Sequence, residues 1–104
     1  MHYKIVIKIQ PDYFNAYNNL GNALRERGEL NEAIIQYRTA IKINPNSAIA
    51  HYNLGRAFQK RAELVKAIAH FRKAIKLKPD FVEAQNNLRT LSQNTLIQGL
   101  KNLF

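Results

Sequence analysis

The chain has 104 residues, of which 46% are hydrophobic, and 16 Lys and Arg residues against 7 Asp and Glu residues give a net charge of +9. This length suits a single domain with its own core, and the apolar content excludes a disordered polycation. The absence of Cys excludes a disulfide framework, a thiolate metal site and a cysteine nucleophile. We see no signal peptide and no apolar run of the roughly 20 residues that a membrane span needs, so we expect a cytoplasmic protein.

The sequence repeats itself at a fixed period. Residues 14–47 and 48–81 share 15 identities in 34 positions without a gap, and Pro11, Pro45 and Pro79 follow the same period. Such self-similarity indicates an array of small structural units. The chain therefore contains two full units, preceded by the second half of a unit (1–13) and followed by the start of another (82–104).

The N-terminal segment and each full unit are predicted to be helical. Residues 2–10 alternate like a strand when taken alone, but they match the second helix of the later units, so we favour a helix. In residues 14–47 apolar side chains recur at spacings of three and four, which predicts two amphipathic helices. Gly28 lies between these helices and can end the first one in a left-handed conformation. Ala62 takes this place in the next unit, so its turn is less well specified.

Prolines and small residues suggest how the helices begin and pack. Asn46 and Asp80 follow prolines and are candidate helix caps, and Asp80 with Glu83 has the spacing of a capping box. Gly21 and Gly55 are predicted to allow close approach of two helices, because larger side chains would overpack the contact.

The repeated positions resemble the tetratricopeptide repeat, whose pattern is W-x2-L-G-x2-Y, then A-x3-F, then P over about 34 residues. The first unit matches it at Tyr17, Leu20, Gly21, Leu24, Ala33, Tyr37 and Pro45. The second unit matches it at Leu54, Gly55, Phe58, Ala67, Phe71 and Pro79, and His51 replaces the aromatic residue that opens the pattern. The resemblance implies an all-α fold, an α-solenoid of antiparallel helix pairs. Its single domain, residues 1–104, would comprise a half repeat (1–13), two repeats (14–47 and 48–81) and a capping helix with an apolar tail (82–104).

Both ends depart from the repeat pattern. Arg89 replaces the repeat glycine, so the segment from Val82 to about Asn94 is expected to be a terminal capping helix. The apolar residues beyond it could fold back on the chain, mediate self-association or be disordered. The half repeat also leaves an apolar face, including Ile5 and Ile9, without its partner helix. A homo-oligomer is therefore possible, as is a fragment of a longer array.

The sequence offers no candidate catalytic residues. His2, His51 and His70 are not spaced with carboxylates as a metal site requires, and His51 occupies an aromatic packing position. There is no Ser/His/Asp arrangement and no glycine-rich phosphate loop. We therefore expect a protein that is not an enzyme and that needs no cofactor or metal.

The family's arrays curve, so the resemblance implies a concave groove lined by polar residues of the first helices. The candidate groove residues are Asn15, Asn18, Asn19, Asn22, Arg25, Tyr52, Asn53, Arg56, Lys60, Asn86 and Asn87. Asn19, Asn53 and Asn87 recur at the same place in successive units and form a predicted ladder. Amide side chains can both donate to and accept from a peptide backbone. The resemblance to the O-GlcNAc transferase superhelix implies this use, whereas the alternative is polar filler that bridges helices.

A second mode of the family is the carboxylate clamp that grips acidic C-termini of heat-shock chaperones. Asn22 and Asn53 occupy the places of its two asparagines, but Asn18, Glu83 and Asn87 stand where it needs basic residues. We therefore reject the clamp.

The basic residues form two further ladders on the second helices: Lys4, Arg38 and Arg72, and four positions on, Lys8, Lys42 and Lys76. They are expected to face outward on the convex side as a solvated surface. No aromatic residues are interleaved with them, so nucleic acid is an unfavoured partner. The preferred function is a scaffold that binds a protein or an extended peptide in the groove. The alternatives are electrostatic binding of nucleic acid or an anionic surface, and self-assembly.

Overall fold

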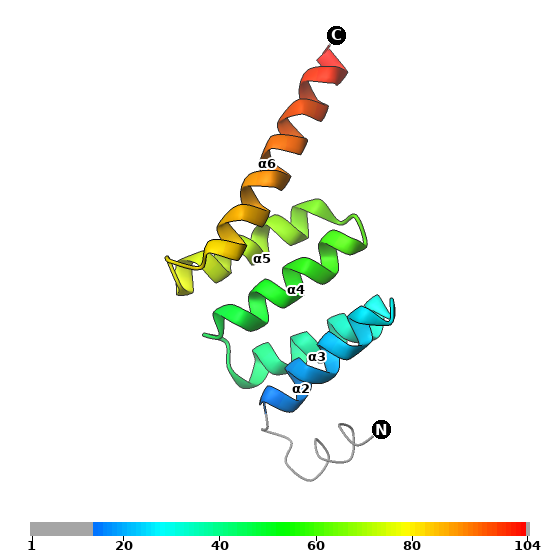
Figure 1. The fold of residues 1–104 in the computed structure, drawn as a ribbon, viewed down its shortest axis with the longest axis vertical. Helices are drawn as coiled ribbons and strands as arrows, with labels where there is room; N and C mark the ends of the chain where they lie inside the picture. The colour runs from blue at the N-terminus through cyan, green and yellow to red at the C-terminus, as the bar shows by residue number, and fades with distance from the viewer. Residues whose placement is uncertain (1–13, 104) are drawn as a thin grey trace.

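The computed structural model describes the backbone of residues 14–103 and the side chains of residues 14–93. Within this range the chain forms the helices α2 (Phe14–Glu26), α3 (Leu30–Ile43), α4 (Ala48–Lys60), α5 (Leu64–Leu77) and α6 (Val82–Leu103). Helix α2 packs on α3, α3 on α4, α4 on α5 and α5 on α6, so antiparallel pairs stack in chain order (Figure 1). This arrangement confirms the predicted all-α solenoid. The predicted N-terminal half repeat lies outside the described residues.

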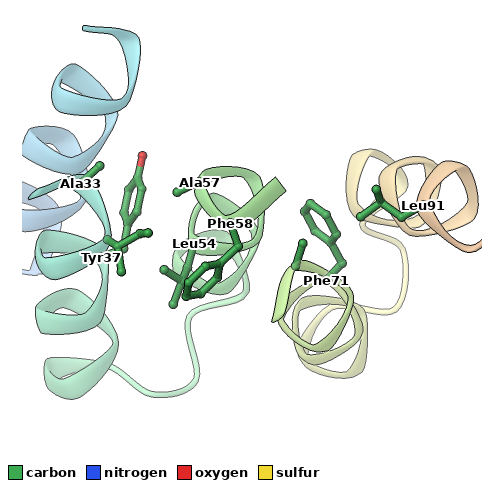
Figure 2. Packing of buried hydrophobic residues seen from close by; sticks show 9 residues of the cluster. Ala33, Tyr37, Leu54, Ala57, Phe58, Phe71 and Leu91 are labelled. Carbon is green, nitrogen blue, oxygen red and sulfur yellow. The ribbon is translucent and has the colours of Figure 1, made fainter. Parts of the chain in front are cut away.

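The largest cluster of buried residues is a row of side chains that crosses the helix pairs, with smaller clusters around Leu20 and Phe81. Tyr37, Leu54, Phe58 and Phe71 are its largest fully buried members, and they come from α3, α4 and α5. Leu91 of α6 closes the row against Phe71 (Figure 2). Each such side chain stabilises the fold by about 1.5–3 kcal/mol relative to an exposed one. Because every helix adds one face to this row, neighbouring repeats share one core.

The two repeat glycines make room for an aromatic ring of the same repeat. A Cβ atom on Gly21 would lie 2.5 Å from Cε1 of Tyr37, and one on Gly55 would lie 2.8 Å from Cε1 of Phe71. Carbon atoms do not approach so closely without displacement. The glycines therefore allow the close approach that the sequence predicts, and the group they admit is a ring from the second helix.

The turns inside the two repeats have the same geometry. Gly28 has φ 80°, its N–H donates to the Arg25 carbonyl, and the Glu29 N–H donates to the Leu24 carbonyl. These two bonds define a Schellman motif. Ala62 adopts φ 62°, and equivalent bonds join it to Gln59 and Glu63 to Phe58. The second turn is therefore as well defined as the first, in spite of a residue that disfavours this backbone conformation.

The caps differ from the prediction. Helix α4 begins with Ser47 as its N-cap, and the Ser47 hydroxyl accepts from the Ala50 N–H at 3.2 Å. The prediction of Asn46 as this cap is wrong, because Asn46 belongs to the preceding turn. Helix α6 begins at Val82, immediately after Phe81, so Asp80 lies one residue outside the capping position.

Helix α6 runs without interruption from Val82 to Leu103, so the capping helix and the tail are one helix. Its C-terminal half extends away from α4 and α5 (Figure 1), and this direction is incompatible with the tail folding back on the repeats.

Candidate interaction face

The predicted groove residues lie on the first helix of each unit, α2, α4 and α6, which we call the A-helix face. Their burial divides them into three groups. Asn15, Asn19, Lys60 and Asn86 are exposed, whereas Asn22, Tyr52, Arg56 and Asn87 are partly buried. Asn18, Arg25 and Asn53 are buried. The three members of the asparagine ladder therefore have three different environments, although they are equivalent in the repeat.

Asn18 and Asn53 join the first two repeats to each other. The Asn53 amide Nδ2 donates to Asn18 Oδ1 at 3.3 Å, across the line where α2 packs on α4. We call this line the α2–α4 seam. Both amides are at least nine-tenths buried. These two residues thus bridge helices, which is the alternative role considered for the asparagines.

Tyr37 brings a hydroxyl group into the same seam from α3. The hydroxyl donates to Asn22 Oδ1 at 2.5 Å and accepts from Arg25 Nη1 at 2.9 Å, and Arg25 Nη1 also lies 3.3 Å from Asn22 Oδ1. Burial raises the pKa of Tyr37 to about 12, against the opposing effect of the Arg25 and Arg56 charges. The phenol is therefore neutral at physiological pH.

The two asparagines that matched the carboxylate clamp are thus both engaged within the protein. Asn22 accepts from Tyr37 and Arg25, while Asn53 donates to Asn18. Their engagement agrees with our rejection of the clamp.

The α4–α6 side of the face is aromatic. The Tyr52 ring lies 4.8 Å from the Phe81 ring and 5.8 Å from the Phe71 ring, between centroids. The Arg56 guanidinium carbon lies 5.7 Å from the Tyr52 centroid, within the range of a cation–π contact. Tyr52 therefore contributes mainly packing, and it orients Arg56 at the surface.

His51 and His70 form a pair on α4 and α5. Their Nδ1 atoms are 3.3 Å apart, and their nearly parallel rings are stacked with centroids 5.5 Å apart and an interplanar angle of 22°. His51 Nε2 lies 3.1 Å from the Pro45 carbonyl, which can only accept, so this nitrogen carries the proton and His70 donates to His51. Burial lowers the pKa of both rings, that of His70 to about 4 with further contributions from His51 and Arg38. His51 is a buried structural residue, in agreement with its predicted packing position.

The predicted basic ladders are exposed where the structure describes them, at Arg38, Lys42, Arg72 and Lys76. A hollow of about 420 Å³ lies against α3 and is lined by Ile35, Arg38, Thr39, Ile41 and Lys42. The exposed large hydrophobic residues among the described side chains are aliphatic. This part of the chain therefore has no exposed aromatic ring on which a nucleic-acid base could stack.

Two other kinds of site are absent from the described residues. No group of three or more His, Asp or Glu side chains is arranged there to hold a metal ion. None of the helices in this part of the chain has both the length and the apolar content to cross a membrane.

Sequence reasoning missed two polar partners. The repeat pattern accounts for the ring of Tyr37 but not for its hydroxyl. The signal was present, because the second repeat has Phe71 at this position and a buried tyrosine hydroxyl needs a partner. His70 as the partner of His51 had no comparable signal, since the two residues are 19 positions apart on different helices.

Comparison with known proteins identifies the repeat. Three family models of the tetratricopeptide repeat (TPR) match the sequence. The one described as TPR repeat matches residues 21–61, and two described as tetratricopeptide repeat match residues 2–35 and 48–81. No curated protein matches the sequence.

Several solved structures share the fold. An O-GlcNAc transferase mutant of Thermobaculum terrenum has 29% identity and a TM-score of 0.81, over 86% of this chain and 17% of that one. The crystal structure of MamA has 28% identity and a TM-score of 0.83, over 89% and 54%. The first TPR of Spaghetti (RPAP3), bound to the HSP90 peptide SRMEEVD, has 22% identity and a TM-score of 0.87, over 90% and 75%. The chain thus spans about a sixth and about half of the first two. With its regular repeat period, stacked helix pairs and matching models, the chain belongs to the tetratricopeptide repeat family.

Proposed function

We propose that the chain is a non-catalytic scaffold that binds an extended peptide segment of a partner protein on the A-helix face. The observation that carries this proposal is the set of accessible amides on the A-helix face. Asn15 and Asn19 are exposed on α2, and on α6 Asn86 is exposed and Asn87 partly exposed. Each amide can donate to a backbone carbonyl and accept from a backbone N–H.

One of the structural neighbours supports this proposal by its fold. The Spaghetti (RPAP3) domain is described with a bound HSP90 peptide, so a domain of this architecture can hold a short peptide. The fold itself serves many functions, and the bound sequence must be determined by the residues of each site. The partner of this chain, its assembly with further copies and its cytoplasmic location stay predictions.

Binding can be tested with a degenerate set of fluorescent nonapeptides that are blocked at both ends and carry a central Gln. We expect Asn19→Ala combined with Asn87→Ala to lower the affinity about tenfold, because a neutral hydrogen bond contributes about 0.5–1.5 kcal/mol. Asn53 is left intact, since its removal would deprive buried Asn18 of its partner. Asn31→Ala combined with Asn46→Ala removes two exposed amides from outside the face and serves as the matched control.

The salt dependence separates this proposal from electrostatic binding by the basic ladders. Peptide binding through amides should change little between low and moderate salt, whereas phosphate binding weakens steeply. Equal loss in the control pair, or undiminished binding in the Asn19 and Asn87 double variant, would contradict the proposal.

A further inference from the structure

Arg25 on α2 and Arg56 on α4 carry guanidinium groups that have no carboxylate partner among the described side chains. The ion pairs in this part of the chain join Arg27 to Glu29, and Arg61 and Lys66 to Glu63. Arg25 is only 7% exposed, and its hydrogen bonds go to neutral groups, the Tyr37 hydroxyl and the Asn22 amide. A buried charge without a counterion is costly, so this arrangement is unusual for a purely structural arginine.

Neither of the groups that bind Arg25 can neutralise it. The Asn22 side chain carries no charge, and burial keeps the Tyr37 phenol protonated with a pKa of about 12. The phenol also uses its proton to bind Asn22, so it meets Arg25 as an acceptor. The seam therefore holds a full positive charge beneath its surface.

Arg56 brings a second positive charge from α4, three residues after Asn53, whose amide meets Asn18 of α2 at the seam. Its guanidinium is held against the Tyr52 ring, and it is more accessible than Arg25. The charges of Arg25 and Arg56 both lower the pKa of Tyr37, so both are felt at its hydroxyl. Lys60 lies one helical turn further along α4 and is exposed. One acid opposes these charges, because Glu26 at the end of α2 raises the same pKa.

We propose that this part of the seam is a subsite for an Asp or Glu side chain of the bound peptide, which Arg56 contacts directly and Arg25 attracts from below. The inference rests on the proposed function, since it assigns a chemical preference to a peptide on the A-helix face. Arg56 offers the planar donor group that suits a carboxylate. The amides of Asn19 and Asn22 lie on the adjoining α2 surface, where neutral parts of the peptide can bind. A peptide is favoured over nucleic acid because this site is compact and offers no exposed ring for a base.

The test compares two sets of blocked fluorescent nonapeptides that differ only in a central Glu or a central Gln. Anisotropy titrations at about 150 mM salt suppress attraction by distant surface charges. We expect the Glu set to bind about tenfold more tightly, as a charge-assisted hydrogen bond allows. Arg56→Gln should abolish this preference, and Glu26→Gln should increase it.

The control is Arg72→Gln, which removes the same charge from an exposed position on α5 and should leave the preference unchanged. Arg25→Gln should also reduce the preference for Glu. If Arg25→Gln is unstable, Arg56→Gln alone tests the subsite.

Equal binding of the Glu and Gln sets would overturn the subsite and leave the proposed function intact, whereas binding of neither set would overturn both. A preference that Arg72→Gln weakens as much as Arg56→Gln would reduce the effect to general charge attraction. Binding of a mixed-sequence oligonucleotide that Arg56→Gln abolishes would assign the seam to phosphate and overturn the inference.

Discussion

The two turns inside the repeats form a natural pair for measuring the cost of a left-handed residue. Ala62 and Gly28 occupy equivalent Schellman turns, with φ 62° and φ 80°. An alanine in this left-handed conformation costs about 1–2 kcal/mol. A glycine avoids this cost but loses more conformational entropy on folding, which offsets about 0.5–1 kcal/mol of the difference. We therefore expect Ala62→Gly to stabilise the fold by about 0.5–1 kcal/mol, a rise in Tm of roughly 4 °C.

The reverse change tests the same term without a steric contribution. A Cβ atom on Gly28 would meet no atom within 4 Å, so Gly28→Ala should destabilise by about the amount that Ala62→Gly gains. Ala69 is exposed within α5, and Ala69→Gly serves as the control, with an expected loss of about 1 kcal/mol. Urea and thermal melts followed by circular dichroism measure all three. A destabilised Ala62→Gly variant, or a Gly28→Ala variant as stable as the wild type, would refute the reasoning.

Three further predictions concern the core, a cap and the histidine pair. Gly21→Ala should lower the free energy of unfolding by about 2 kcal/mol, because the added methyl group would overlap the Tyr37 ring. Tyr37→Phe should lower it by about 1–3 kcal/mol, because Asn22 and Arg25 would lose a buried hydrogen-bond partner. Urea melts measure both. Ser47→Ala should cost about 1 kcal/mol in the same assay, since it removes the cap of α4. Burial lowers the pKa of His51 and His70, so the unfolded chain takes up protons on these residues before the folded chain does. The free energy of unfolding should therefore be constant above pH 6.5 and fall by about 2 kcal/mol towards pH 4. His70→Phe should flatten this profile, which melts at a series of pH values measure. A flat wild-type profile, or unchanged melts of the other variants, would contradict these expectations.

The repeat positions could be predicted from the sequence because their role is local and recurs in every unit. Gly21 and Gly55 were assigned to close contacts, and Gly28 to a left-handed turn, as the structure has them. The family resemblance, combined with the periodicity, assigned the candidate binding residues to the first helices. These features depend on spacing along one helix or on one backbone angle, both of which the sequence carries directly.

The differences among equivalent positions could not be predicted in this way. Asn19 and Asn53 are repeat partners, yet Asn53 is buried because Asn18 meets it across the seam, whereas Asn19 is exposed. The predicted cap Asn46 lost to Ser47 because the helix begins one residue later. Such outcomes depend on what neighbouring repeats contribute, and a pattern that treats the repeats alike does not contain this information.

The two junctions between successive first helices are held by different chemistry, and this has a mechanical consequence. At the first junction the amides of Asn18 and Asn53 meet in a hydrogen bond, which has a preferred length and direction. At the second, the rings of Tyr52 and Phe81 meet at a tilt of 41° and are held by packing. We therefore expect a stretch or twist of the array to be opposed by a directional bond at the first junction and by ring packing at the second.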